Sequence, residues 1–142
     1  MTIKIETLDS LLGKDEPKGT FHDSSLLSVS VDYDKKLLTA DFDICVGDPD
    51  RKDQPARERY SRGRLTVKGL GFWFMEAPTT PSDKWVACPW LTDDGPLNTC
   101  PTAAAKLLFQ RAAGKDFAWY FYFSDLNTFA YVAGDSVSFE WS

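Results

Sequence analysis

Hydrophobic and polar residues alternate along two neighbouring runs in the first third of the chain. The first run places apolar side chains at every second position, at Leu27, Val29, Val31 and Tyr33. After the turn-like Asp34-Lys35-Lys36, the alternation resumes with Leu38, Ala40, Phe42, Ile44 and Val46. A period of two places alternate side chains on one face of a strand. The pattern therefore predicts a hairpin with one buried face and one polar face.

Strand-like sequence returns in the middle and at the end of the chain. The run from Tyr60 to Glu76 is interrupted by Gly69 and Gly71, which predicts a bulge or a sharp bend. Further predicted strands cover 84–87, 117–123, 128–133 and 137–141, and the last three form a meander. Asp93-Asp94-Gly95-Pro96 is typical of a turn, and residues 47–56 are predicted to be an exposed loop.

Helical sequence is limited to two segments. Residues 5–12 predict a short helix or an irregular lead-in that ends at Gly13. The main helix is predicted at about 101–113, because a proline stands in its first turn and Gly114 lies just past its end. Its packing stripe is expected to be Ala105, Leu108, Phe109 and Ala112.

Together these elements predict one α+β domain over residues 1–142. We expect a mainly antiparallel curled sheet or half-barrel of about six to eight strands, with the main helix packed on one face. The chain has 142 residues, 43% of them hydrophobic and 26% charged, as in ordinary globular domains. No stretch approaches the roughly 18–20 apolar residues of a membrane span, and the first residues do not resemble a signal peptide. We therefore expect a cytoplasmic protein with reduced cysteines and no membrane association.

The candidate catalytic and metal-binding patterns in the sequence are weak. His22-Asp23 resembles the metal-ligating pair of some phosphohydrolases, but those sites need further histidines, and His22 is the single histidine of the chain. The three cysteines do not form the close pairs that are typical of structural zinc sites. No Gly-x-Ser-x-Gly segment, dinucleotide fingerprint or phosphate-binding loop occurs. We expect no metal, no cofactor and no catalytic residue, so enzymatic activity is disfavoured.

Charge is distributed unevenly along the chain. Residues 51–68 carry a formal charge of +5, whereas the whole chain carries −5. The overall acidity disfavours nucleic-acid binding, which requires neutralisation of many phosphates. Asp41 and Asp43 are predicted on the outward face of the hairpin, where Asp32 would complete an acidic patch. This patch is one candidate surface for a protein partner.

Aromatic residues make up 14% of the chain, and most of them are expected in the core. Trp85 and Trp90 flank Cys88-Pro89 in a proline-rich stretch, so we expect them to be partly exposed and to contribute to partner binding. An alternative candidate site is a small-ligand pocket in the curled sheet. Its expected lining is Trp73, Trp119 and Tyr122, with Arg62 or Arg64 binding an anionic group.

Two segments carry a resemblance to known proteins. Residues 21–33, Phe-His-Asp-Ser-Ser-Leu-Leu-Ser-Val-Ser-Val-Asp-Tyr, run into 37–43, and this region resembles small uncharacterised bacterial domains that open with a His-Asp-(Ala/Ser)-x-Leu hairpin. Some immunity-type proteins of polymorphic toxin systems are similar there. Residues 122–129 and 137–141 are similar to the end of such domains. The resemblance implies a β-rich fold and a protein-binding role, and it transfers no catalytic residue.

The sequence supports two functional hypotheses. The first is a non-enzymatic domain that binds another protein, with an immunity-like inhibitor of a basic toxin as its most specific form. An acidic inhibitor would be steered onto a nuclease toxin, which must be basic to hold nucleic acid. The second is the binding of a small ligand in the aromatic pocket. The sequence does not specify the oligomeric state.

Overall fold

The computed structural model describes residues 5–13, 19–46, 59–85 and 88–142, and the predicted loop at 47–56 lies outside them. The described elements are the strands β1 (Thr20–Asp32), β2 (Leu37–Cys45), β3 (Tyr60–Lys68), β4 (Phe72–Met75), β5 (Trp90–Pro96), β6 (Phe117–Phe123), β7 (Thr128–Gly134) and β8 (Ser136–Trp141), the helix α2 (Ala103–Arg111), and the 3-10 turns η1 (Leu8–Leu12), η2 (Ser82–Lys84) and η3 (Leu97–Thr99). The predicted α+β class is confirmed.

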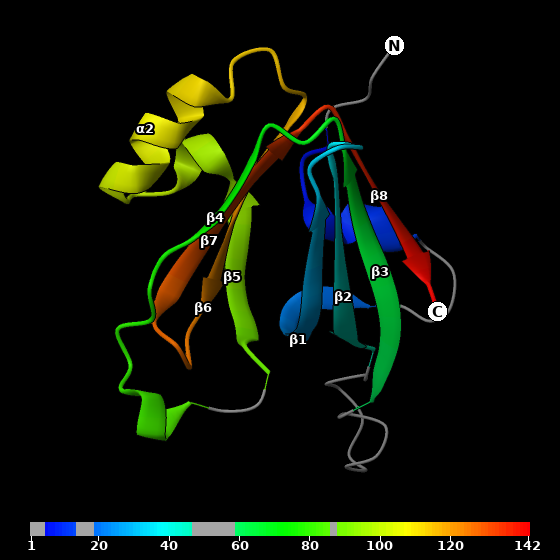
Figure 1. Cartoon of the computed structure of the whole chain (residues 1–142). Helices are drawn as coiled ribbons and strands as arrows, with labels where there is room; N and C mark the ends of the chain where they lie inside the picture. The colour runs from blue at the N-terminus through cyan, green and yellow to red at the C-terminus, as the bar shows by residue number, and fades with distance from the viewer. Residues whose placement is uncertain (1–4, 14–18, 47–58, 86–87) are drawn as a thin grey trace.

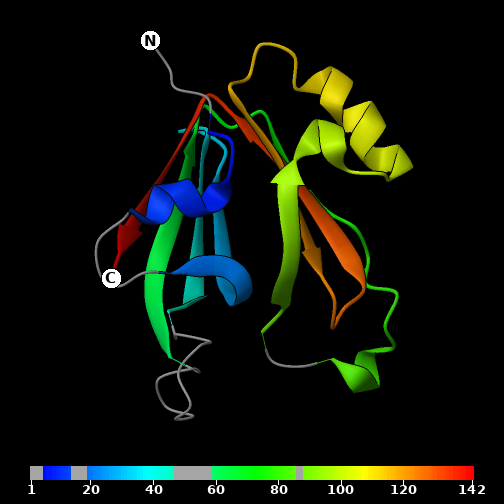
Figure 2. The same cartoon turned by 180° about the vertical axis from the view of Figure 1, so that it is seen from behind.

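All eight strands belong to one antiparallel sheet in the order β4-β7-β6-β5-β1-β2-β3-β8. The sheet does not close, because β4 and β8 form its two ends. Figures 1 and 2 show it folded into two halves. We call the half made of β1, β2, β3 and β8 the first half-sheet, and the half made of β4 to β7 the second half-sheet.

The two half-sheets are joined where two long strands bend. Strand β3 passes into β4 at residues 69–71, and β7 passes into β8 at Asp135, so that β3 pairs with β8 while β4 pairs with β7. Gly69 has a φ of +63°, which lets the chain leave β3 at this point. The bend predicted from Gly69 and Gly71 is confirmed. A second contact between the halves is short, because β1 pairs with β5 only at Ser24 and Ser25.

The main core fills the space between the half-sheets. Strand β2 contributes the alternating residues that the sequence predicts, Leu38, Ala40, Phe42 and Ile44, all of them buried. Strand β6 contributes Phe117, Trp119, Phe121 and Phe123 from the opposite half. On the first strand the pattern is wrong in part. A bulge between Leu26 and Ser28 places Leu26 in the core in place of Leu27, and Tyr33 lies in the turn with 85% of its surface exposed.

Helix α2 covers the outer face of the second half-sheet. Its Thr102 cap accepts a hydrogen bond from Ala105 N at 3.1 Å, and Ala105 and Ala112 pack over Tyr131 and Ala133. The sequence placed Phe109 in the packing stripe, and this prediction is wrong, because Phe109 is 48% exposed. The two small alanines set the contacting face of the helix, and Phe109 lies at the side of this face.

Two other local predictions are wrong. Residues 84–87 do not begin a strand, since Ser82–Lys84 forms a 3-10 turn, and positions 86–87 lie outside the described residues. Residues 93–96 are not a turn but the end of β5. The polar side chains there are satisfied across the sheet, because Tyr120 Oη donates to Asp93 and Trp119 Nε1 donates to Asp94. In the described part of the chain, the helices are too short or too polar to traverse a lipid bilayer.

Candidate functional site

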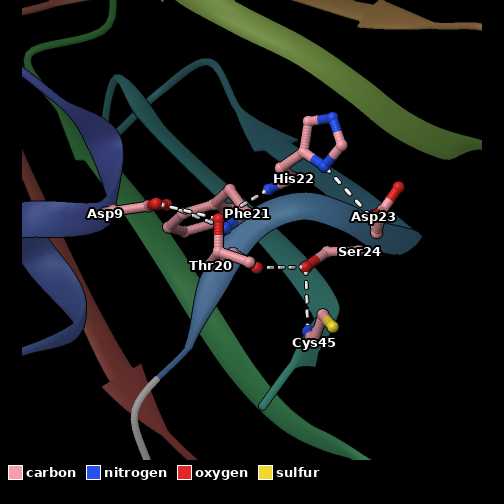
Figure 3. A network of polar contacts seen from close by, with 7 residues as sticks. All are labelled: Asp9, Thr20, Phe21, His22, Asp23, Ser24 and Cys45. Carbon is pink, nitrogen blue, oxygen red and sulfur yellow. Dashed lines mark hydrogen bonds and ion pairs between the residues drawn. The ribbon is translucent and has the colours of Figure 1, made fainter. Parts of the chain in front are cut away.

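Strand β1 begins with a bulged segment that presents His22 and Asp23. Thr20 is opposite Cys45 and Ser25 is opposite Asp43, so four residues of β1 face a single residue of β2. Asp23 has a φ of +68°, a left-handed conformation that is unfavourable for a residue with a side chain. Figure 3 shows the segment arching away from β2. Strained backbone of this kind persists only where surrounding contacts enforce it.

Polar contacts from two directions hold the bulge. The Ser24 hydroxyl donates to Thr20 O at 2.8 Å and accepts from Cys45 N at 3.0 Å (Figure 3). From η1, the Asp9 carboxylate accepts one hydrogen bond from the Thr20 hydroxyl and one from Phe21 N, both at 2.8 Å. Below these contacts the Phe21 ring is fully buried and packs edge-on against Phe42 at 5.2 Å. The bulge is therefore anchored at its base while its tip stays in solvent.

At the tip of the bulge, His22 Nδ1 lies 3.1 Å from Asp23 Oδ2, and the two side chains are 59% and 44% exposed. The sequence singled out this pair, and the structure places it on the surface. In the part of the chain that is described, no three His, Cys, Asp or Glu side chains lie close enough together to hold a metal ion. All three cysteines are free, and Cys100 is buried beneath α2.

Beside the bulge lies a cleft of about 230 Å³. It is bounded on one side by residues 6–9 around η1, and on the other by Asp94, Gly95 and Pro96 of β5 together with Trp119 of β6. Trp119 is buried in the core, but its indole edge reaches the cleft and donates to Asp94 Oδ2 at 2.7 Å. The cleft thus combines apolar walls with oriented carboxylates.

The electrostatics of the cleft centre on Asp94. Burial raises the pKa of this carboxyl above its ordinary value, and the nearby negative charges of Asp9 and Asp93 raise it further. The Trp119 hydrogen bond and the charge of His22 act in the opposite direction. The charges of η1, of β5 and of the bulge therefore all act on the Asp94 carboxyl. A carboxyl with a perturbed pKa in a cleft marks a candidate functional site.

Neither Asp9 nor Asp94 was singled out by the sequence. Asp94 belonged to a predicted turn and Asp9 to a predicted lead-in, and no spacing rule connects residues so far apart. Trp119 was predicted to line a small-ligand pocket, and its indole N–H is the group that reaches the cleft. The sequence signals that touched the region were therefore His22-Asp23 and Trp119.

The predicted acidic patch lies on the outer face of the first half-sheet, but it is not free of positive charge. Arg64 Nε donates to Asp41 Oδ1 at 2.8 Å and its Nη2 to Asp41 Oδ2 at 3.2 Å. This contact lowers the pKa of Asp41, chiefly through the Arg64 hydrogen bond. Asp43 is in register with Arg62. Asp32 Oδ1 accepts a hydrogen bond from Lys35 N in the hairpin turn.

The residues predicted to line a ligand pocket are not brought together. Trp73 lines a small apolar space in the core, Trp119 reaches the cleft, and Arg62 and Arg64 lie on strand β3 near Asp41 and Asp43. The Tyr122 hydroxyl donates to Asn127 at 2.7 Å, and its ring packs against Phe129. These five side chains come from the strands β3, β4 and β6 and lie in four separate places.

The expected exposure of Trp85 and Trp90 is confirmed, at 49% and 44%. Trp85 Nε1 donates to Thr80 O at 2.7 Å, and Trp90 N donates to Asp125 Oδ1 at 3.0 Å. Both contacts fix the position of the residue and leave much of the indole surface in solvent. Partner binding by these tryptophans remains a prediction.

Comparisons with known proteins do not identify a family for this chain. No family model matches the sequence, and no curated protein is significantly similar to it. The crystal structure of an uncharacterized protein from Neisseria gonorrhoeae resembles this chain with a TM-score of 0.41 and 12% sequence identity, over 87% of this chain and 95% of that one. A likeness of this size carries no argument about function.

Proposed function

We propose that this chain is a non-enzymatic, cytoplasmic binding domain that recognises a protein partner with basic side chains. The observation that supports the proposal is the cleft between η1 and β5, where Glu6, Asp9 and Asp94 lie beside apolar walls. Complementary charge attracts a basic partner from a distance and favours it over acidic ones. The net charge of −5 acts in the same direction.

The state of Asp94 explains why a basic group would be held. A partly buried carboxylate loses hydration, and this loss is balanced only by donors or cations close to it. Trp119 supplies one donor, yet burial keeps the pKa of Asp94 raised. A cation brought by the partner would stabilise the charged form of Asp94. Binding energy is therefore available at this position.

The outer face of the hairpin is less suited to this role. Asp41 already has a cationic neighbour in Arg64, and Asp43 stands opposite Arg62. A basic partner would have to compete with these arginines for the carboxylates. We therefore place the contact at the cleft and not on the face that carries Asp32, Asp41 and Asp43, and we keep Trp85 and Trp90 as outlying candidates.

Inhibition of a basic toxin is the most specific form of the proposal. The resemblance of residues 21–33 to some immunity-type proteins supports it, and an acidic inhibitor is suited to cover a nucleic-acid-binding surface. The bulge that carries His22 and Asp23 falls in the same segment and adjoins the cleft. The segment that carries the resemblance and the acidic cleft therefore lie on one side of the molecule.

The proposal is tested by affinity purification of the tagged protein from its native host, with three forms compared. These are the wild type, Asp94→Asn, and Asp41→Asn as a control that removes the same charge from the outer face. We expect one stoichiometric basic partner that Asp41→Asn retains and Asp94→Asn captures at least tenfold less. Retention of the partner by both variants would contradict the location, and the absence of any partner of the wild type would contradict the function.

A further inference from the structure

We infer that the cleft receives a single guanidinium group, the arginine side chain of the proposed partner. This inference rests on the proposed function and names the chemistry of the contact. The cleft is about 230 Å³, whereas a water molecule takes roughly 30 Å³ in the liquid. It therefore has room for a whole side chain.

The walls of the cleft suit the aliphatic part of an arginine. Pro96 supplies apolar surface at the end of β5, whereas Leu8 of η1, which lines the opposite side, is almost fully buried. Long basic side chains bury their methylene groups along such surfaces while the charged head finds polar partners.

The carboxylates favour the planar guanidinium group of arginine over the compact ammonium group of lysine. Each carboxylate oxygen has two acceptor positions, and Trp119 Nε1 takes one of those on Asp94 Oδ2. The indole thereby fixes the orientation of the carboxylate. Guanidinium groups bind oriented carboxylates through two parallel hydrogen bonds and are more weakly hydrated than ammonium, so they enter a partly buried site at less cost.

Asp9 is placed to assist from the opposite wall. Its two oxygens accept from the Thr20 hydroxyl and Phe21 N, which fixes the carboxylate at the base of the bulge. Both contacts come from uncharged donors and leave its negative charge in place. Asp9 lines the same cleft as Asp94, so one guanidinium can lie between the two carboxylates.

The test is an NMR titration of the full chain, with the indole N–H of Trp119 as the reporter. Three capped probes are compared: Nα-acetyl-arginine amide, Nα-acetyl-lysine amide, and the uncharged isostere Nα-acetyl-citrulline amide. For an isolated side chain we expect a dissociation constant on the order of 1 mM. The arginine probe should shift the Trp119 signal saturably, the lysine probe should bind at least threefold more weakly, and citrulline should leave the signal unchanged.

Two variants locate the effect. Asp94→Asn keeps an amide oxygen for Trp119 Nε1, so its spectrum should stay folded while the arginine-dependent shift is lost. Asp41→Asn should retain the full shift. Equal shifts with citrulline, or an undiminished shift in Asp94→Asn, would overturn the inference.

Failure of the guanidinium inference can be distinguished from failure of the protein-binding proposal. If the partner is captured in an Asp94-dependent way but the arginine probe does not bind, the guanidinium inference is overturned and the protein-binding proposal stands. If the arginine probe binds through Asp94 and no protein is captured, the guanidinium site stands and its ligand is a free molecule. In that case the protein-binding proposal is overturned.

Discussion

Trp119 and Asp94 are linked by a 2.7 Å hydrogen bond that joins the core to the cleft. The indole is buried between the half-sheets, and only its N–H edge reaches the carboxylate. Trp119 of β6 is in register with Pro96 of β5, and its side chain reaches diagonally to Asp94, two residues earlier on β5. A core residue thereby orients a group at the surface of the molecule.

The first prediction concerns the pH dependence that Asp94 gives to stability. Its pKa is raised in the folded state, chiefly by burial, so the folded protein holds this proton more tightly than the unfolded chain, where the pKa is near 3.8. The contribution of Asp94 to stability is therefore complete below pH 3.8 and is lost as the pH rises through the folded-state pKa. Asp94→Asn removes this loss. We expect its melting temperature at pH 7 to equal or exceed that of the wild type, with the difference shrinking toward pH 3.5.

Asp41 provides a control of opposite sign for thermal unfolding between pH 3 and 7. Its pKa is lowered, first by the Arg64 hydrogen bond, so its contribution to stability is present above pH 3.8 and is lost as the pH falls through the folded-state value. Asp41→Asn should therefore be slightly less stable than the wild type at pH 7. A fall in the melting temperature of Asp94→Asn at pH 7 would refute the assigned cause of the Asp94 shift.

The second prediction concerns the Ser24 hydroxyl at the base of the bulge. Ser24 is fully buried, and its hydroxyl bridges Thr20 O and Cys45 N. Ser24→Ala leaves both backbone groups without this partner and should lower the free energy of unfolding by about 1–3 kcal/mol. Urea denaturation measures the change. Ser28→Ala is the matched control on the exposed part of the same strand and should change stability by less than about 0.5 kcal/mol.

The third prediction separates strain from function at Asp23. Its φ of +68° favours glycine over any residue with a side chain. Asp23→Gly should raise the free energy of unfolding by about 0.5–1 kcal/mol, while Asp23→Val should lower it. If the strained aspartate serves recognition, the same glycine variant should bind the partner more weakly. Destabilisation by glycine would show that the His22 contact outweighs the backbone strain.

The fourth prediction concerns the bend between the half-sheets at Gly134. A Cβ there would stand 2.3 Å from Val67 Cγ1 and 3.0 Å from Lys68 O, both on the paired part of β3. Gly134→Ala should lower the free energy of unfolding by about 1–3 kcal/mol because neither neighbour has room to move. Gly71→Ala is the control, since the closest atom to a Cβ at position 71 belongs to the flexible Lys115 side chain, at 3.2 Å. Chemical denaturation of both variants should show the difference.

The sequence predicted most of the architecture because alternation is a local property. Strand β2 repeats apolar and polar residues without interruption, and the structure buries its apolar set as expected. The prediction was wrong where tertiary contacts override local signals. Asp93, Asp94, Gly95 and Pro96 have the composition of a turn, yet they extend β5 because Tyr120 and Trp119 satisfy the two carboxylates.

The candidate site was much less predictable than the fold. Its carboxylates come from η1 and β5, and they meet only because the sheet folds back and places β1 beside β5. No motif marks Asp9, whose role depends on hydrogen bonds to Thr20 and Phe21. The adjacent His22 and Asp23 were noticeable in the sequence because they are neighbours in the chain.

The pairing of the bent strands also limits the order in which the sheet can form during synthesis. Strand β3 pairs with β8, the last of the described strands, and β4 pairs with β7, which lies more than fifty residues later in the sequence. During vectorial synthesis the edge of β3 stays unpaired until residues 136–141 have emerged, and unpaired edges are where nascent sheets associate wrongly. We therefore expect the first half-sheet to remain incomplete until β8 has emerged from the ribosome, and the β3–β8 pairing to be among the last to form in this sheet.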